Sequence, residues 1–215
     1  MSLRLFSTWR SSAAYRVRIV LALKGVAYEY VAVNLVKAEH RRPEYLALNP
    51  QGRVPLLVDG DFRLGQSLAI FDYLEGRHPK PALVPSEPRR RARMLAFCMA
   101  IVADTHPLQN MGPGQYLAEH FGADEAKKAA WNRHWIQQGL EALERERDGT
   151  GDTACVFGET PTWADCVLVP QVYNAERWGC DLAGFPRLYA LAQRLRALPA
   201  FAAAHPDRQP DAPKA

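Results

Sequence analysis

The chain has 215 residues, of which 48% are hydrophobic and 23% are charged. These are ordinary globular proportions, and a chain of this length forms one large domain or two small ones. No apolar run approaches the ~20 residues that a membrane-spanning helix needs, so we expect no membrane association of that kind. The first ten residues include Arg4 and Arg10 and lack the apolar stretch of a signal peptide. We therefore expect a cytoplasmic protein.

The excess positive charge lies in the first third of the chain. Residues 1–78 contain eleven Lys and Arg against seven Asp and Glu, whereas the remainder contains 16 of each. This pattern suits a region that receives anionic small molecules, although scattered solvated charge explains it equally well. The arginines within 89–93 have no interleaved aromatic residues, so we do not expect nucleic-acid binding.

The cysteines show no pattern of metal or redox chemistry. They form no CxxC pair and have no His-rich partner segment, so we expect no metal site. Buried free thiols are the favoured interpretation for all four: Cys98, Cys155, Cys166 and Cys180.

The first 33 residues read as a β-α-β unit. Leu3 to Phe6 alternate as in a strand, and the periodic run AYRVRIVLALKG predicts a helix that ends near Gly25. A serine just before the first turn is a usual N-cap. The β-branched and aromatic stretch from Tyr28 to Val33 predicts a second strand, parallel to the first.

A hairpin and a helix follow a polar stretch with a short helix. Residues 54–58 and 62–64 predict two strands joined by the turn Asp59-Gly60-Asp61. Gln66 and Ser67 then open a helix over 68–77. The predicted order is therefore β-α-β, a short helix, and β-β-α.

Prolines at 79, 81, 85 and 88 exclude a continuous helix and indicate an interdomain linker. We predict domains at 1–78 and 89–215, with 79–88 as the linker. The second domain has helical periodicity over 89–111, 124–147, 162–177 and 187–197, and Thr162 to Asp165 has the form of a capping box. The tail after Pro206 is either a poorly ordered end or an extended strap.

Several segments together carry a family resemblance. Residues 10–25, RSSAAYRVRIVLALKG, are similar to the RSSCSWRVRIALALKG signature of zeta-class glutathione transferases, the family of maleylacetoacetate and maleylpyruvate isomerases. The similarity continues through LALNPQGRVPLL, GQSLAIFDYLE, HPLQN and VPQVYNAERWGCDL to RQPDAP, in order and over essentially the whole chain. The resemblance implies an α/β thioredoxin-like glutathione-binding domain followed by an all-α domain, the architecture of cytosolic glutathione transferases. It also implies glutathione as cofactor and a homodimer.

The resemblance implies roles for residues of the first domain in binding glutathione. Ser11 matches the serine that hydrogen-bonds the glutathione sulfur, and Ser12 lies beside it. Val54 precedes an expected cis proline and pairs its backbone with the cysteinyl unit. Gln66 and Ser67 match the pair that holds the γ-glutamyl carboxylate. A helix N-terminus favours both anions, the thiolate and the carboxylate.

Further positions follow from the same resemblance. His40, Gln109 and Asn110 match residues that line the glutathione site. Arg10 and Arg177 match arginines that hold substrate carboxylates, and guanidinium groups suit a dicarboxylate because they bind carboxylates in bidentate fashion.

Each of these residues also has a purely structural interpretation. Ser11 and Ser67 serve equally well as N-caps, and Arg177 as a cation that complements a helix dipole.

Two departures from the family pattern stand out. Ala13 replaces the cysteine of many family members, which excludes a contribution from that thiol. Gly112-Pro113-Gly114 follows Asn110 where a continuous helix is expected, so the sequence leaves the local wall of the substrate pocket unassigned.

The resemblance implies a glutathione-dependent cis-trans isomerase of maleyl keto acids that works by reversible thiolate addition, in aromatic amino acid catabolism. One alternative is a glutathione transferase that conjugates electrophiles such as α-halo acids. Another is a non-catalytic glutathione-transferase-like binding protein, against which the joint presence of Ser11, Gln66, Ser67 and both arginines argues.

Overall fold

The computed structural model describes residues 3–147 and 153–213, and the chain forms two compact units. Unit 1 comprises residues 1–83 and 196–215, and unit 2 comprises residues 84–195. The change of unit at 83/84 falls within the predicted linker. The end of the chain differs from the prediction, which placed all of 89–215 in one domain, because residues 196–215 belong to the first unit.

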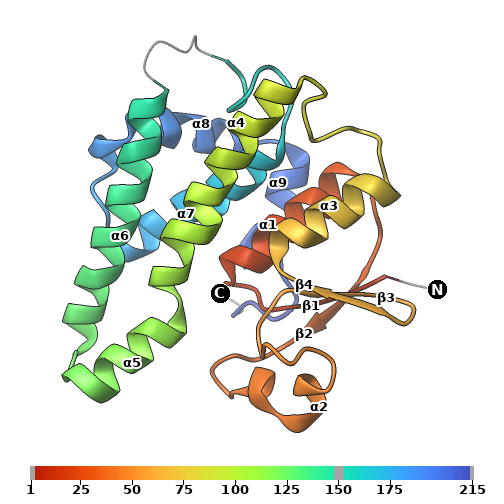
Figure 1. Cartoon of the computed structure of the whole chain (residues 1–215). Coiled ribbons are helices and arrows are strands. Elements are labelled where there is room, and N and C mark those ends of the chain that lie inside the picture. Colours follow the sequence, from red (N-terminus) through yellow and green to blue (C-terminus); the bar gives the residue numbers. More distant parts are fainter. Residues whose placement is uncertain (1–2, 148–152, 214–215) are drawn as a thin grey trace. The chain divides into compact units, whose positions relative to one another are not determined.

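The described residues of unit 1 form a four-stranded sheet in the order β2-β1-β3-β4 (Figure 1). Its strands are β1 (Arg4–Ser7), β2 (Glu29–Ala32), β3 (Leu56–Asp59) and β4 (Phe62–Gly65). β1 pairs parallel with β2, and both β1 with β3 and β3 with β4 pair antiparallel. The predicted β-α-β unit and the hairpin are therefore confirmed.

The sheet of unit 1 has helices on both faces. Helices α1 (Ser12–Leu23) and α3 (Ser67–Arg77) pack against each other on one face, and α2 (Pro43–Leu46) lies on the other (Figure 1). Phe6, Val33, Tyr45, Leu56 and Val58 form a buried cluster, with Tyr45 supplied by α2. Because side chains alternate along a strand, Leu5 and its partner Leu57 point to the opposite face. This arrangement fixes the starting points of α1 and α3, where the predicted site residues Ser11, Gln66 and Ser67 lie.

The last part of the chain completes unit 1. Helix α9 (Pro199–Ala203) packs against α1 and fully buries Phe201. Beyond it, the 3-10 turn η5 (Pro206–Arg208) leads to Asp211, whose carboxylate accepts a hydrogen bond from the Trp9 backbone N–H at 3.0 Å. The described residues after Pro206 lie against unit 1 as a strap, but they form successive turns and not the extended segment that the sequence predicted.

Unit 2 is helical throughout its described regular elements. They are α4 (Pro88–Met99), η2 (Ala100–Thr105, a π-helix), η3 (His106–Gln109), α5 (Met111–Phe121), α6 (Glu125–Glu146), α7 (Trp163–Trp178), η4 (Leu182–Gly184) and α8 (Pro186–Arg196). Helices α4 and α6 both pack against α7, which is buried on nearly every face. It therefore forms the centre of the unit.

Helix α5 corrects an expectation from the sequence. Gly112, Pro113 and Gly114 lie inside its first turn and do not interrupt it. The N–H groups of a first turn have no intrahelical acceptor, so a proline there costs no hydrogen bond. The first such bond runs from Gly114 N to Asn110 O at 3.5 Å. The chain thus remains helical after Asn110, although in a new helix.

The predicted capping box at the start of α7 is confirmed. One carboxylate oxygen of Asp165 accepts hydrogen bonds from the backbone N–H of Thr162 at 2.7 Å and from its hydroxyl at 2.9 Å. The other accepts from the Val156 backbone N–H at 2.8 Å. Complete burial raises the pKa of Asp165, and these hydrogen bonds oppose that shift. Both ends of the motif therefore bond to backbone or hydroxyl groups of the fold itself.

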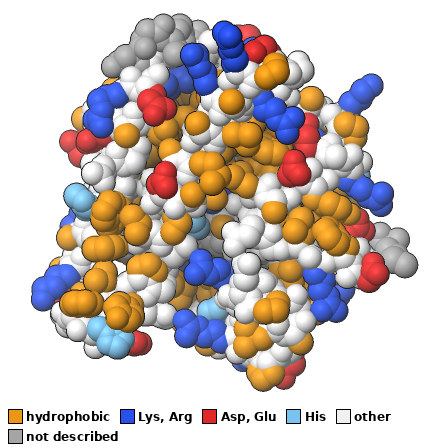
Figure 2. Space-filling view, in the orientation of Figure 1, with side chains coloured by type: hydrophobic (Ala, Val, Ile, Leu, Met, Phe, Trp, Pro, Cys, Tyr) orange, Lys and Arg blue, Asp and Glu red, His pale blue; other side chains and the backbone are white. Residues whose placement is uncertain are grey.

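The surface of unit 2 carries exposed apolar side chains on one helix. Met111, Tyr116 and Phe121 of α5 are all exposed, and hydrophobic side chains gather in this part of the molecule in Figure 2. The aromatic ring of Tyr116 lies 4.2 Å from the His120 ring. In the described ranges, no helix is both long enough and apolar enough to cross a membrane.

Candidate active site

The N-terminus of α1 presents a serine hydroxyl. Ser11 is the N-cap, with extended backbone angles, and its hydroxyl oxygen accepts a hydrogen bond from the Ala14 N–H at 3.2 Å. A hydroxyl that accepts one hydrogen bond still has its own hydrogen to donate. The capping and sulfur-binding interpretations of Ser11 are thus compatible. Ser12 is the first helical residue and only 5% exposed, whereas Ser11 is half-buried.

Arg10 precedes this cap and reaches solvent. Its side chain is exposed, and its guanidinium lies 5.3 Å from the centre of the Trp9 ring. It forms no ion pair with any of the residues that the structure describes. A cation held only by an aromatic face remains able to bind a carboxylate.

The N-terminus of α3 has a different arrangement. Gln66 occupies the N-cap position with φ 67° and ψ 117°, and its side chain caps no backbone N–H. Its Nε2 instead donates to Gln51 Oε1 at 2.8 Å. A positive φ is rare for a residue other than glycine, and such backbone conformations concentrate at ligand sites. With no side-chain cap, the first N–H groups of α3 are available to an anion.

Ser67 begins α3 rather than capping it, one residue away from the predicted position. Gln66 has non-helical backbone angles and therefore takes the N-cap position. The Ser67 side chain is buried, and its hydroxyl accepts a hydrogen bond from Arg16 Nη1 at 3.5 Å. Sequence reasoning missed Arg16 as part of this region. The available signal was an arginine within the apolar run of α1.

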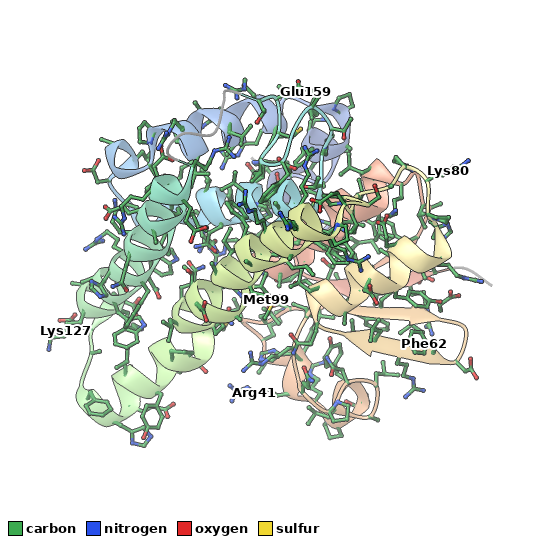
Figure 3. The ribbon with its side chains drawn as sticks, turned by 45° about the horizontal axis from the view of Figure 1, so that its top comes forward. Arg41, Phe62, Lys80, Met99, Lys127 and Glu159 are labelled. Atoms are coloured by element: carbon green, nitrogen blue, oxygen red, sulfur yellow. The ribbon has the colours of Figure 1, made fainter. Side chains whose placement is uncertain are left out.

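Two further positions of unit 1 have unsatisfied polar groups. Val54 lies before β3 with a cis bond to Pro55, as predicted, and its backbone N–H and C=O bond to no described residue. His40 lies in the 3-10 turn η1 (Glu39–Arg41), whose last residue is labelled in Figure 3. Its Nδ1 is buried and has no partner among the described residues. Burial, and secondly the charge of Arg41, lowers the pKa of His40, which favours the neutral imidazole.

Unit 2 carries the other predicted positions. Gln109 is 8% exposed, and its Nε2 donates to Gln171 Oε1 at 2.7 Å. Its Oε1 has no partner within the described part of the chain. Asn110 occupies the N-cap position of α5, but its side chain caps no N–H.

Arg177 lies in the last turn of α7, as expected for a cation that complements the helix dipole. Its Nη1 donates to Asn174 Oδ1 at 3.0 Å, and its guanidinium lies 5.9 Å and 5.7 Å from the Tyr173 and Trp178 rings. The side chain is nevertheless exposed, so these contacts orient the guanidinium without burying it.

The predicted site residues divide between the units. Unit 1 holds Arg10, Ser11, Ser12, His40, Val54, Gln66 and Ser67, and unit 2 holds Gln109, Asn110 and Arg177. All four cysteines are free and buried, as predicted. Burial raises the pKa of Cys155 to about 12 and that of Cys180 to about 11. Within the described ranges, no three His, Cys, Asp or Glu side chains gather as a metal site would require.

The fold and these helix ends define the class of protein. Residues 1–76 match the family described as glutathione S-transferase, N-terminal domain. With its thioredoxin-like four-stranded sheet and helical second unit, the chain has the glutathione transferase fold.

Individual relatives narrow the assignment. Maleylacetoacetate isomerase of Pseudomonas aeruginosa is 48% identical over 99% of this chain and 100% of that protein. The holo structure of a maleyl pyruvate isomerase, a bacterial zeta-class enzyme, is 43% identical with a TM-score of 0.96, over 98% of this chain and 100% of that one. Maleylacetoacetate isomerase from Anaeromyxobacter dehalogenans 2CP-1, with bound dicarboxyethyl glutathione and citrate in the active site, is 45% identical with a TM-score of 0.87, over 99% and 98%. This chain belongs to the zeta-class glutathione transferases, the family of these isomerases, which confirms the resemblance.

Proposed function

We propose that the protein is a glutathione-dependent cis-trans isomerase that converts maleylacetoacetate or maleylpyruvate to the fumaryl form. The observation that carries this proposal is the N-terminus of α1. There the Ser11 hydroxyl is half-buried, keeps a hydrogen to donate, and lies at the positive end of the helix dipole. Such a position stabilises a thiolate. The relatives of this chain that bear isomerase names support the choice of reaction.

The polar groups of unit 1 fit glutathione. The uncapped N-terminus of α3, with Gln66 and Ser67, suits the γ-glutamyl carboxylate. The backbone of Val54, which bonds to no described residue, suits the extended cysteinyl unit, as an added strand pairs with an open edge. The Ser11 hydroxyl then faces the sulfur.

Glutathione would also give hydrogen-bond partners to two buried polar atoms, one in unit 2 and one in η1 of unit 1. Gln109 Oε1 is a buried acceptor and His40 Nδ1 a buried acceptor or donor, and neither has a described partner. Burying such groups unpaired is costly. We propose that both residues, with Asn110, take part in binding glutathione.

In this reaction the residues of the chain hold the glutathione sulfur and the substrate carboxylates in place. When bound, glutathione supplies a thiolate that adds reversibly to the substrate double bond and leaves after rotation. Ser11 donates its hydroxyl hydrogen to the sulfur, with Ser12 beside it. Arg10 and Arg177 bind the substrate carboxylates and stabilise the negative charge that develops on substrate oxygen.

One assay tests the proposal. The absorbance of maleylpyruvate or maleylacetoacetate is followed after addition of protein, with and without glutathione, while free thiol is measured in parallel. We expect isomerisation that requires glutathione and consumes none of it. Consumption of thiol in proportion to turnover would instead identify a conjugating transferase. Binding of glutathione without any turnover would identify a binding protein.

The resemblance also supports a cytoplasmic homodimer that acts in aromatic amino acid catabolism. Light scattering of the purified protein should give the mass of two chains. A monomer at micromolar concentration would contradict the homodimer without affecting the assignment of the reaction.

A further inference from the structure

The loop from Ser7 to Ser11 connects β1 to α1 and carries both Arg10 and Ser11. The backbone polar groups of Thr8, Trp9 and Arg10 lie outside the sheet and the helix, so they need other partners. The Trp9 N–H donates to Asp211 Oδ2 at 3.0 Å, and the Trp9 C=O accepts from Arg18 Nη2 at 3.0 Å. Both polar groups of the residue before Arg10 are therefore held by charged side chains.

Asp211 ties this loop to a neighbouring strand. Its Oδ2 also accepts from the Thr8 hydroxyl at 3.4 Å, and its Oδ1 accepts from the Tyr30 hydroxyl of β2 at 2.6 Å. Burial, and secondly this hydrogen bond to Asp211, raises the pKa of Tyr30, so the phenol remains a donor at neutral pH. One carboxylate thus joins the tail, the loop and β2.

Arg18 holds the same loop from the interior. Its side chain is almost completely buried, and its Nη1 donates to Ser7 Oγ at 3.1 Å and to Thr8 O at 3.4 Å. Its Nε donates to Ala204 O, after α9, at 3.1 Å. The end of the chain therefore holds the loop in two ways. It supplies the Asp211 carboxylate, and the Ala204 C=O binds the Arg18 side chain.

The tail is itself built to place Asp211. Gln209 is 9% exposed, and its Nε2 donates to Ala203 O at 3.2 Å and to His205 O at 2.8 Å. The Ala212 N–H closes a turn on Gln209 O at 3.0 Å. Asp211 lies within that turn, so its carboxylate has a defined direction.

We infer that Asp211, acting with Arg18, is a positioning residue of the active site: through the Trp9 peptide it fixes the directions of the Arg10 side chain and the Ser11 hydroxyl. This inference rests on the proposed function, because Asp211 acts through those two residues. The Ser11 N–H donates to Thr8 O at 3.1 Å, so the fixed part of the loop extends directly to the cap of α1.

The test is Asp211→Ala, with kinetics and the ultraviolet absorbance of the bound glutathione thiolate as readouts. We expect kcat to fall about tenfold to a hundredfold, the range for misplacing a catalytic group from outside the site. The pKa of the bound thiol should rise, because the Ser11 hydroxyl no longer points consistently at the sulfur. Glutathione affinity measured at a pH where the bound thiol is still protonated should change little, because no contact of Asp211 reaches Gln66 or Ser67.

Two variants make the test specific. Asp207→Ala is the matched control, because Asp207 is the same residue type in the same tail and its carboxylate contacts only His205 Nδ1, at 3.6 Å, among the described residues. We expect wild-type kinetics and thiol pKa for it. Asp211→Asn should restore much of the activity, because its amide oxygen accepts from the Trp9 N–H and its amide nitrogen donates to the Tyr30 oxygen.

Several outcomes decide the matter. An Asp211→Ala protein with the kcat and thiol pKa of the Asp207→Ala control overturns the inference, even if its melting temperature falls. If Asp211→Ala does not fold, Asp211→Ser takes its place as the test. The serine hydroxyl is too short to bond both Trp9 and Tyr30, so this variant breaks the same link.

Ser11→Gly separates this inference from the proposed function. If Ser11→Gly is inactive and Asp211→Ala is normal, only the positioning role is wrong. If both keep full activity, the proposed site is wrong. If the wild type has no isomerase activity, the thiol pKa still tests whether Asp211 positions Ser11, and an unchanged value overturns it.

Discussion

The two helices that begin at the candidate site of unit 1, α1 and α3, differ in whether a side chain caps the N-terminus. The N-terminus of α1 is capped by its own serine, Ser11, whose oxygen accepts from Ala14 N. The N-terminus of α3 has no side-chain cap, because Gln66 turns away at positive φ to meet Gln51. A capped end offers one hydroxyl hydrogen, which suits a single sulfur atom. An uncapped end offers several N–H groups, which suit a carboxylate.

This difference teaches that one structural feature, a helix N-terminus, serves two anions of different size. The partial positive charge is common to both ends. What distinguishes them is whether the backbone donors are already used. The predictions below test each end separately, beginning with the largest expected effect.

Removal of the Ser11 hydroxyl should reduce turnover about a hundredfold, the scale for losing one donor to a developing anion. Ser11→Gly is the sharper variant, because glycine as N-cap costs only a few tenths of a kcal/mol whereas Ser11→Ala costs about 1 kcal/mol. Steady-state kinetics and thermal unfolding measure the two effects. Ser12→Ala is the control, and a loss confined to that variant would move the sulfur contact from Ser11 to Ser12.

Arg10→Ala and Arg177→Ala should each reduce isomerisation about thirtyfold or more, because a substrate carboxylate loses its charged partner. Lysine should restore the activity only partly, since an ammonium lacks the two-pronged geometry of guanidinium. Conjugation of a neutral aromatic electrophile, measured on the same variants, is the control. Equal losses in both reactions would indicate general damage, and no loss in isomerisation would favour the conjugating transferase.

Ser67→Ala should act at the N-terminus of α3 and weaken glutathione binding by about 1–3 kcal/mol, as expected for a hydrogen bond to a charged group. It also removes the acceptor of Arg16 Nη1, so thermal unfolding is measured beside binding. Calorimetric titration measures this directly. The kcat at saturating glutathione should change much less than in Ser11→Gly. Unchanged affinity would remove the γ-glutamyl carboxylate from the N-terminus of α3.

Blocking the protein thiols should have the smallest effect, namely none on activity. Ala13 leaves no thiol in the first turn of α1, and the pKa values of about 12 for Cys155 and about 11 for Cys180 keep these thiols protonated at pH 8. Iodoacetamide at that pH should leave the isomerase rate unchanged, while mass spectrometry shows modification of all four cysteines only after unfolding. Rapid inactivation of the native protein would show that a thiol takes part.

The β-α-β unit and the hairpin were predictable because each depends on local periodicity, which Leu3–Phe6 and the run before Gly25 display clearly. Helix α5 was not, because Gly112, Pro113 and Gly114 are read as helix breakers unless the start of the helix is known. The N-cap of α3 was misplaced by one residue for a related reason. Backbone angles, which no residue type reveals, decide that Gln66 and not Ser67 stands outside the helix.

The candidate site divides in the same way. The identity of Ser11, and its place just before an apolar periodic run, followed from the sequence, since capping is a local interaction. The family resemblance added Gln66, Ser67 and the two arginines to the list of site residues. It did not predict the side chains that hold them in position.

The sequence by itself determined the order of the elements and the chemical groups at the helix ends. Only the tertiary structure decided what fixes the loop of Arg10 and Ser11, because Trp9 and its partner Asp211 are 202 positions apart. No period or spacing joins such distant residues. Their contact arises when α9 packs on α1 with Phe201 buried, which brings the tail to the loop that follows β1. That apolar packing brings the Asp211 carboxylate to the Trp9 N–H, and a loop polar group that would otherwise lack a partner gains a charged acceptor.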